Sequence, residues 1–402
     1  MRNGIPRPGS TKAVRRAQDA PERRSERADR SSPYGAFRKL QRERSGATVG
    51  VGVLGYGYWG PNLVRNFAET APARLVAVSD LAVDRLAEVH RRYPKVKLTT
   101  DFRDVLADRS VDAVVIATPV ASHFELALRA LEAGKHVLVT KPITTSSDET
   151  MQLIEAAEQR GLVLMVDHTF VYTGAVQTIK QLVDSGDLGS LYYYDSVRVN
   201  LGLFQKDVNV LWDLAVHDLA IMDYVLGRQP SAVAATGAAH IPGHQANIAY
   251  LTCYFDGSLI THHHVNWLAP LKVRRTLVGG ARQMIVYDEL EPSEKVKVYD
   301  KGITVAGDTQ GAIETMIGYR TGDMWAPQVS LTEGLRTEAQ HFLECVTHRR
   351  QPLTDGLCGL RVIRILEAAA ASLRQRGQPV EVVGSPESAS RPPKLKVMEK
   401  SA

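Results

Sequence analysis

Residues 49–60 read VGVGVLGYGYWG, an apolar run followed at once by three glycines in the spacing G-x-G-x-x-G. The run 49–54 is short enough for a buried strand, and residues 61–69 have the length and spacing of a helix. Pro61 suits a helix start, because its missing N–H would have no intrahelical partner there. The stretch therefore predicts a strand, a tight turn and a helix in direct succession.

The same alternation continues along the next hundred residues. Further strands are expected at residues 74–79, 112–117, 136–140 and 162–167. Helices between them are expected at residues 84–92, 122–133 and 146–160. Strands that are apolar throughout and separated by amphipathic helices indicate a parallel sheet covered on both faces. The sequence therefore predicts an α/β domain, a Rossmann dinucleotide-binding domain, over residues 49–170.

From residue 191 the segments become longer and alternate in polarity, which indicates a mainly antiparallel, open-faced sheet. Its strands are expected at residues 191–199, 248–255, 259–266, 272–278, 284–287 and 296–299. Helices expected at residues 332–348 and 359–376 would cover one face and leave the other for a partner subunit. The sequence thus predicts an α+β domain for substrate binding and oligomerisation over residues 171–380.

Length and composition agree with two globular domains. The chain has 402 residues, of which 44% are apolar and 23% charged. It contains no apolar run of the roughly 20 residues that cross a bilayer, so we expect neither membrane insertion nor secretion. The cysteines, Cys253, Cys345 and Cys358, are too few for a disulfide framework and lack zinc-site spacing. A cytoplasmic location is expected.

Positive charge is concentrated at the N-terminus. Residues 1–48 contain 13 Lys and Arg against 5 Asp and Glu, whereas the remainder has 36 against 39. This segment is rich in Pro, Ser and Gly and cannot bury enough apolar surface to fold, so we expect a disordered basic tail. The arginines from Arg15 to Arg30 are not interleaved with aromatic residues, which argues against a nucleic-acid partner. A second flexible tail is expected over residues 381–402.

The glycine-rich turn is the first candidate for cofactor binding. Gly55 allows the tight turn, Gly57 lets the backbone approach a pyrophosphate, and Gly60 permits close packing of the helix. Tyr58 and Trp59 lie between these glycines and are expected to line the same cofactor.

Two further cofactor elements follow in the chain. Asp80 ends the strand expected at residues 74–79, and a carboxylate there accepts hydrogen bonds from an adenosine ribose and repels a 2′-phosphate. NAD is therefore favoured over NADP. Thr118 and Pro119 follow the next strand, at the edge where open α/β sheets bind ligands, and should line the nicotinamide side. His123 belongs either to this lining or to a helix start without a functional role.

Proton-transfer candidates come from two distant segments. The segment 210–226 is expected to be a helix, on which Asp213 and His217 stand four residues apart and share a face. A carboxylate in that position can orient an imidazole that acts as a general base, or the pair can simply stabilise the helix. We find no third metal ligand and expect no metal. Lys141, which precedes Pro142 at a strand end, is well placed to donate to a substrate hydroxyl.

Tyr172, Arg198 and Asn200 are candidates for the substrate pocket. Each is equally plausible as a sheet or helix-surface residue, and the sequence leaves both possibilities open.

Four motifs occur together in the order GYGYWG at residues 55–60, ATPVASH at 117–123, AGKHVLVTKP at 133–142 and WDLAVHD at 212–218. Over residues 48–380 the chain thereby resembles the Gfo/Idh/MocA oxidoreductase family. Within it, LVDSGDLGSLYYYDSVRVNLG at residues 182–202 is similar to the branch that oxidises C3 of UDP-N-acetylhexosamines or their uronic acids.

This resemblance implies an NAD-dependent enzyme that transfers a hydride between a nucleotide-sugar hydroxyl or ketone and the nicotinamide. It implies a homodimer or homotetramer and catalytic roles for Lys141, Asp213 and His217. The peptide between the lysine and the proline is often cis in the family. The chain has Thr140 and Val216 where Glu and Pro are usual. An NAD-dependent glycosidase of the same superfamily and a non-catalytic dinucleotide sensor remain alternatives.

Overall fold

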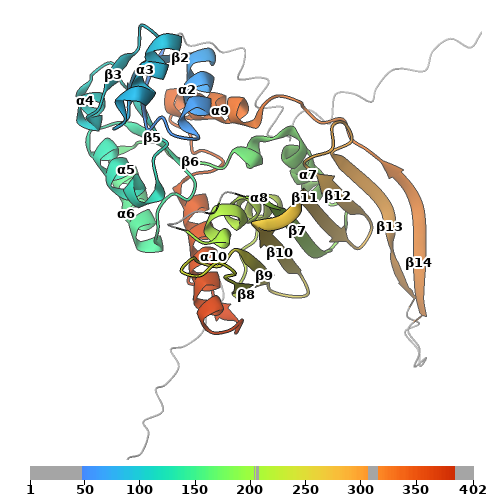
Figure 1. Ribbon diagram of the computed structural model, residues 1–402. Coiled ribbons are helices and arrows are strands. Elements are labelled where there is room, and N and C mark those ends of the chain that lie inside the picture. The colour runs from blue at the N-terminus through green and yellow to red at the C-terminus, as the bar shows by residue number, and fades with distance from the viewer. Residues whose placement is uncertain (1–47, 203, 205–207, 307–315, 385–402) are drawn as a thin grey trace, which may run out of the picture. The chain divides into compact units, whose positions relative to one another are not determined.

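The chain forms two separate sheets with helices around them (Figure 1). The computed structural model describes residues 48–202, 204, 208–306 and 316–384, all in the unit that spans Ala47–Ala402. Apart from residue 48, the segment expected as a basic tail lies outside the described residues. Among the described residues, no helix is long and apolar enough to cross a membrane.

The first sheet is parallel throughout, with strand order β3-β2-β1-β4-β5-β6. Its strands are β1 (Val49–Leu54), β2 (Ala73–Ser79), β3 (Lys97–Thr99), β4 (Ala113–Ile116), β5 (His136–Thr140) and β6 (Leu164–Asp167). Its helices are α2 (Gly60–Glu69), α3 (Val83–Arg92), α4 (Phe102–Ala107), α5 (His123–Glu132) and α6 (Ser147–Arg160). The α/β prediction is confirmed. Strand order reverses between β1 and β4, and ligands of such sheets bind beyond the carboxyl ends at this point.

The second sheet has the order β14-β13-β12-β11-β7-β10-β9-β8-β15 and is antiparallel except for the pair β7–β10. Its strands are β7 (Leu191–Leu201), β8 (Ala232–Ala238), β9 (Ile248–Tyr254), β10 (Ile260–Asn266), β11 (Leu268–Gly280), β12 (Met284–Asp288), β13 (Val296–Ala306), β14 (Met316–Trp325) and β15 (Val380–Glu381). Its helical segments are α7 (Gly174–Asp184), the π-helical turn η3 (Leu211–Ala215), α8 (Val216–Leu226), α9 (Gly334–His348) and α10 (Gly356–Arg374). The mainly antiparallel prediction is confirmed, and β8, β14, β15 and α7 are additions to it.

One face of this sheet packs on helices and the other remains open. In β10, Thr261 and His263 are fully buried, because alternate side chains point to opposite faces. Ile260 and His262 lie on the opposite face and are exposed, and Tyr250 of β9 stacks there on His262. The sheet is therefore open-faced, as the sequence predicted.

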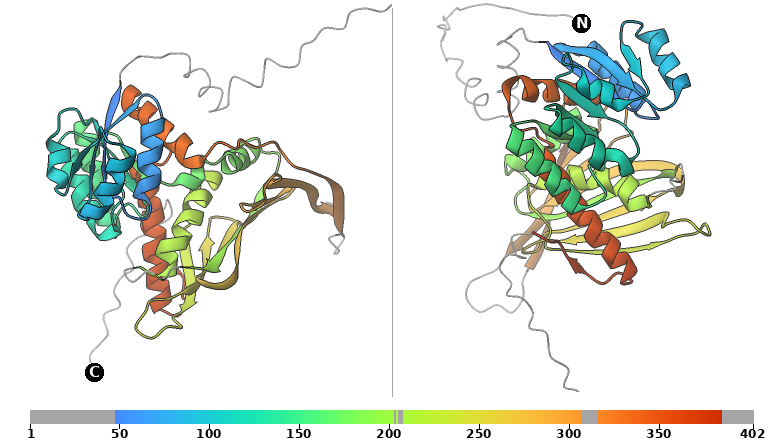
Figure 2. Two further views of the ribbon diagram at one scale, coloured as in Figure 1. Left: turned by 45° about the horizontal axis from the view of Figure 1, so that its top comes forward. Right: turned by 90° about the vertical axis from the view of Figure 1, so that its left-hand side faces the viewer.

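The C-terminal part of the chain packs against both sheets. Helix α10 contacts α6 and β6 on one side and α8 and β8 on the other, and Figure 2 shows it running alongside both regions. Just before α10, the Thr354 carbonyl accepts a hydrogen bond from the Val166 N–H of β6. The tail expected from residue 381 begins too early, because Glu381 pairs with Ala232 and the Val382 N–H donates to Ser231.

Candidate active site

The glycine-rich loop connects β1 directly to α2. Gly55 has φ +95°, a conformation that side chains disfavour, and a Cβ on Gly60 would lie 2.4 Å from the Gly55 carbonyl oxygen. Helix α2 starts at Gly60 without a side-chain cap; Pro61 has no N–H, and the Asn62 N–H donates to the Trp59 carbonyl at 3.0 Å. A Cβ on Gly57 would meet only the flexible Arg85 guanidinium, at 3.6 Å, so the backbone is easily approached there. The loop therefore fits the pyrophosphate of a dinucleotide.

Asp80 stands at the end of β2, directly beside this loop. Its Oδ2 accepts a hydrogen bond of 2.6 Å from the Tyr56 N–H, and its Oδ1 accepts one of 2.8 Å from the Ala82 N–H. The Arg85 guanidinium approaches the same carboxylate at 3.4 Å. The carboxylate therefore holds the turn of the loop, and a cation stands next to it.

Trp59 and Tyr58 behave differently, although they are neighbours in the loop. The Trp59 indole Nε1 donates a hydrogen bond of 2.7 Å to Oδ2 of Asp167, at the carboxyl end of β6. Tyr58 is 90% exposed, so its side chain makes little contact with the protein. The indole thus joins the glycine-rich loop to the far edge of the sheet.

His123 lies behind the cofactor edge. It is 1% exposed, and its ring nitrogens lie 2.8 Å from the carbonyl oxygens of Pro142 and Thr118. Burial lowers its pKa. The expectation that His123 itself lines the cofactor is therefore wrong; it braces two loops that reach the edge, while Thr118 is half-buried and Pro119 exposed.

Lys141 and Asp213, which are 72 residues apart in the chain, meet at the carboxyl end of β5. The ammonium of Lys141 donates to the backbone carbonyl of Asp213 at 2.8 Å and to its Oδ1 at 3.3 Å. The Trp267 indole N–H donates to the other carboxylate oxygen at 3.1 Å. The peptide between Lys141 and Pro142 is cis, as the resemblance implied. Asp213 therefore holds the lysine in place.

His217 does not bond to Asp213, contrary to the expectation. Residues 211–215 form a π-helical turn, in which positions four apart no longer align as they do in an α-helix. Instead, the imidazole packs edge-to-face on the Phe170 ring, with the ring centroids 4.9 Å apart. Its Nδ1 is buried and has no hydrogen-bond partner among the described residues.

Burial and neighbouring cations set the protonation of both groups. Burial lowers the pKa of the Lys141 ammonium, and Asp213 opposes this shift. The pKa of His217 is well below its usual value because of burial, and Lys141, Arg198, His168 and Arg274 lower it further. His217 stands four residues after Asp213, which binds Lys141, so the two groups lie in the same region of the molecule. These shifts favour the unprotonated form of the His217 imidazole.

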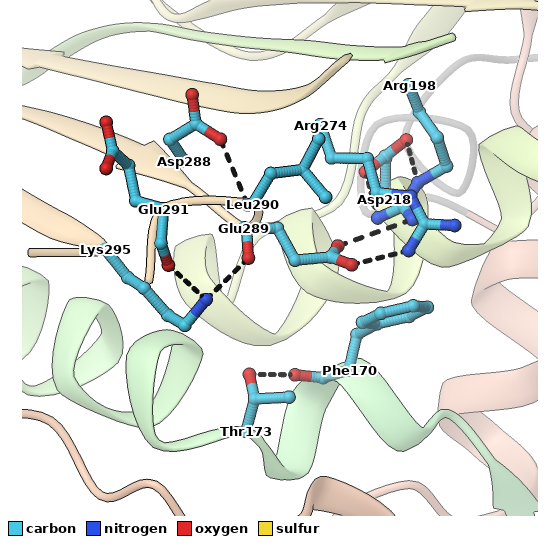
Figure 3. A network of polar contacts seen from close by, with 10 residues as sticks. All are labelled: Phe170, Thr173, Arg198, Asp218, Arg274, Asp288, Glu289, Leu290, Glu291 and Lys295. Atoms are coloured by element: carbon cyan, nitrogen blue, oxygen red, sulfur yellow. Dashed lines mark hydrogen bonds and ion pairs between the residues drawn. The ribbon is translucent and has the colours of Figure 1, made fainter. Parts of the chain in front are cut away.

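Two of the three residues expected in the substrate pocket are buried instead. Tyr172 is 2% exposed, and its hydroxyl bonds to the Thr354 hydroxyl at 2.9 Å. Arg198 is 2% exposed and makes two hydrogen bonds, of 2.9 and 3.0 Å, to Asp218 (Figure 3). These two expectations are wrong, because partners distant in the sequence cover both side chains. Asn200 is half-buried near the end of β7.

The segment after β6 contains residues that the sequence reasoning missed. Asp167 holds Trp59; His168 is buried with both ring nitrogens unpartnered among the described residues; and Phe170 contacts His217. Glu338 of α9 is fully buried, and burial together with the nearby Asp167 raises its pKa well above the usual value. The sequence did contain a signal for Asp167 and His168. They stand at the carboxyl end of a strand, and the same position was the reason for expecting Lys141 in the site.

Comparison with known proteins agrees with this geometry. Residues 49–168 match the model of the GFO/IDH/MocA oxidoreductase family with an NAD-binding Rossmann fold, and residues 176–286 match the GFO/IDH/MocA C-terminal domain.

The similarity to individual relatives extends over nearly the whole length of those proteins. The chain is 28% identical to UDP-N-acetylglucosamine 3-dehydrogenase of Acidithiobacillus ferrooxidans, over 80% of this chain and 95% of the relative. It is 25% identical to an NAD-dependent scyllo-inositol 2-dehydrogenase of Bacillus subtilis, over 84% and 95%.

Solved structures share the fold. A crystal form of the Acidithiobacillus ferrooxidans enzyme aligns with TM-score 0.69 and 26% identity, covering 82% of this chain and 99% of that one. Levoglucosan dehydrogenase in complex with NADH and levoglucosan aligns with TM-score 0.71 at 20% identity, over 84% and 100%. The two family matches, together with the glycine-rich loop and the two sheets, establish that the chain belongs to the Gfo/Idh/MocA family of oxidoreductases.

Proposed function

We propose that the protein is an NAD-dependent dehydrogenase, or ketoreductase in the reverse direction, that interconverts a CH–OH group and a ketone on a sugar. The observation that carries the proposal is the contact of Lys141 with Asp213 beyond the carboxyl end of β5, with His217 four residues further along the chain at the start of α8. The ammonium is fixed by Asp213, and the imidazole lies within its electrostatic reach. A cation and a neutral base on opposite sides of one hydroxyl are what alcohol oxidation requires.

Each of the three groups has a separate task in this proposal. Bound NAD supplies the acceptor for the hydride that leaves the carbinol carbon. His217 removes the hydroxyl proton, which its neutral form at physiological pH permits. Lys141 donates a hydrogen bond to the same oxygen and stabilises the negative charge that develops there. Asp213 orients the ammonium through the contacts described above. In the reverse direction, His217 or Lys141 returns the proton.

The proposed cofactor residues follow from the loop geometry. Gly55, Gly57 and Gly60, with the first turn of α2, would hold the pyrophosphate, and Tyr58 and Trp59 would line it. Thr118 and Pro119 would face the nicotinamide half. The Asp80 carboxylate at the end of β2 supports a preference for NAD over NADP, because it would repel a 2′-phosphate. Arg85, 3.4 Å from this carboxylate, weakens the preference, because its positive charge would attract a 2′-phosphate.

For the substrate we propose a nucleotide-linked sugar that is oxidised at C3, with Asn200 near the pocket. The support is the similarity to UDP-N-acetylglucosamine 3-dehydrogenase along nearly all of that enzyme, together with the resemblance of residues 182–202. The scyllo-inositol dehydrogenase makes free cyclic polyols the main competitor.

We also propose that a second copy of the chain covers the open face of the second sheet. Tyr250, Tyr254 and Ile260 expose 41%, 38% and 43% of their surface on this face. Aromatic and aliphatic groups on one sheet face favour burial in a symmetric dimer or a tetramer built from dimers. Light scattering should give a dimer or tetramer mass, and Tyr250→Asp should lower it; a monomeric wild type would refute this assembly.

The activity is tested by incubating the full chain with NAD and a panel of UDP-sugars, dTDP-sugars and free polyols. Nicotinamide absorbance and product mass are followed together, and a keto product that is 2 Da lighter is expected from one member of the panel. His217→Asn should lower its turnover on the order of 100-fold, while the affinity for NAD changes little.

Three results would contradict the proposal. Wild-type turnover in His217→Asn would remove the imidazole from the reaction. Release of free sugar without net NADH would identify a glycosidase, and no reaction with any member despite tight NAD binding would favour a sensor.

A further inference from the structure

The Phe170 ring lies between the imidazole of His217 and two guanidinium groups. Its contact with His217 is edge-to-face, at 85° between the ring planes. The Arg198 guanidinium carbon lies over the same ring at 4.6 Å from the centroid, and that of Arg274 at 5.6 Å. Figure 3 shows both arginines gathered above the ring. One side chain thus contacts the proposed base and two of the cations around it.

Within the described part of the chain, no carboxylate is hydrogen-bonded to His217. Both oxygens of Asp213 are engaged, with Lys141 and with Trp267, and Asp218 is bound to Arg198. The Nδ1 atom of the imidazole is buried without a partner among the described residues. A histidine that lacks a hydrogen-bonded second nitrogen must be oriented by packing, and the ring of Phe170 is the aromatic surface that packs on it.

The arginines that hold the ring are fixed in turn. Arg198 grips Asp218 with two hydrogen bonds, and Asp218 is the next residue after His217 in the chain. Glu289 accepts from Arg274 at 2.5 Å and pairs with Arg198 at 3.5 Å. Phe170 is anchored by its own backbone, whose carbonyl accepts from the Thr173 hydroxyl at 2.8 Å. The ring of Phe170 is therefore the point where four parts of the chain meet: strands β7 and β11, helix α8 and the segment after β6.

We propose that Phe170 is a positioning residue for the proposed base: its ring, held by Arg198 and Arg274, fixes the half-buried imidazole of His217 and shields part of it from water. The inference rests on the proposed function and adds to it a residue outside the Lys141, Asp213 and His217 set. The ring takes over the orienting task that was expected of Asp213.

The arrangement has a consequence for protonation. The charged groups around the imidazole are Lys141, Arg198 and Arg274, with His168 buried beside them and the carboxylates of Asp213, Asp218 and Glu289 already paired. Loss of the ring would admit water to His217 and screen the two guanidinium charges. Both changes favour the protonated imidazole, so the pKa of His217 should rise toward its ordinary value.

The test is the titration of His217 in the full-chain protein with NAD, followed by NMR on protein carrying 13C at histidine Cε1. The signal is assigned by its absence in His217→Gln. We expect His217 to titrate below the usual histidine range in the wild type, and its midpoint to rise by at least one pH unit in Phe170→Ala. Phe170→Tyr, which keeps the ring, should remain close to the wild type. This readout needs no substrate, so it stands even if the sugar panel fails.

Phe102→Ala is the matched control, because Phe102 also lies under an arginine, Arg103, at 5.6 Å, but belongs to α4. It should leave the His217 titration unchanged. If Phe170→Ala fails to fold, Phe170→Leu keeps the apolar bulk without the ring and is expected to give a smaller rise. An unchanged His217 midpoint in the folded Phe170 variant, or an equal rise in Phe102→Ala, overturns the proposal. Where a substrate is known, Phe170→Ala should lower kcat at least 10-fold with KM for NAD unchanged.

Discussion

The ammonium of Lys141 bonds to Asp213 twice, through the backbone carbonyl at 2.8 Å and the carboxylate at 3.3 Å. The two residues belong to different domains. Lys141 follows β5 of the parallel sheet, and Asp213 lies in the π-helical turn before α8, which packs with the second sheet. The contact therefore fixes the ammonium relative to both halves of the site. The cationic group is held before any substrate arrives, which reduces the reorganisation needed in the transition state.

Lys141→Met should lower turnover about 100-fold or more, because the developing alkoxide loses its charge partner. The affinity for NAD, measured by fluorescence titration, should change less than about 3-fold. Lys135→Met is the matched control: Lys135 is also a buried lysine, and it donates to the carbonyls of Asp108 and Val111 away from the site. That variant should lose stability and keep its turnover, and equal losses of turnover in both would refute the role of Lys141.

Asp80→Ser should weaken NAD binding about 10-fold and improve the use of NADP. The serine removes the repulsion of a 2′-phosphate and leaves Arg85, now 3.4 Å from the carboxylate, free to pair with it. The ratio of kcat/KM values for the two cofactors measures the change. In the double variant with Arg85→Gln, the gain with NADP should disappear; an unaltered cofactor ratio in Asp80→Ser would contradict the ribose assignment.

Trp59→Phe keeps the aromatic ring and removes the N–H that bonds to Asp167 at 2.7 Å. A hydrogen bond to a charged acceptor contributes about 1.5–3 kcal/mol, so NAD affinity should fall about 10-fold as the loop loosens. Asp167→Ala, which removes the acceptor, should have a similar effect. Because the two changes remove the same contact, the double variant should be little worse than either alone, and additive losses would show that the contact does not support the loop.

Acid should destabilise the fold between pH 7 and pH 5. Burial lowers the pKa of His168 and of His263 to about 3, so both stabilise the fold fully above pH 6.5 and lose this contribution as the pH falls toward 3. Each loses about 2 kcal/mol between pH 7 and pH 5. Glu338 acts in the opposite sense, since its raised pKa makes the folded state more favourable as the pH falls.

Urea unfolding at each pH measures these contributions. Glu338→Gln removes the opposing term, so the loss of stability toward pH 5 should become steeper in that variant. A stability that does not change with pH in Glu338→Gln would contradict the buried neutral state of the histidines.

The fold could be predicted from the sequence because buried parallel strands are apolar on both faces. The strands expected at residues 49–54 and 136–140 agree with the observed bounds, and the other three expected in the first sheet agree within two residues, whereas β3 was not expected. Strand β14, residues Met316–Trp325, was missed because its sequence MIGYRTGDMW lacks both a regular alternation and an apolar run. The helix α7 was missed although Thr173 stands at its N-cap; that side chain makes no capping hydrogen bond, and the helix begins at a glycine.

The site was less accessible to sequence reasoning. The convergence of Lys141 with the helix of Asp213 was expected, but the direction of the carboxylate was not, because spacing in an α-helix says nothing about a π-helical turn. Tyr172 and Arg198 were wrongly expected in the pocket. Their side chains are buried by contacts with Thr354 and Asp218, which are 182 and 20 residues away in the chain. Contacts of this range cannot be inferred from local pattern.

The return of the C-terminal helices to the first sheet affects how the protein matures during synthesis. Phe342 of α9 packs on Phe67 of α2, and residue 354 bonds to β6. When only residues 49–170 have emerged from the ribosome, the nucleotide-binding domain still lacks these contacts with the C-terminal helices, and the surface that they cover is exposed. That domain should gain its native stability only after α10 has emerged, so chains truncated before residue 374 will be substrates for chaperones or proteases rather than isolated NAD-binding modules.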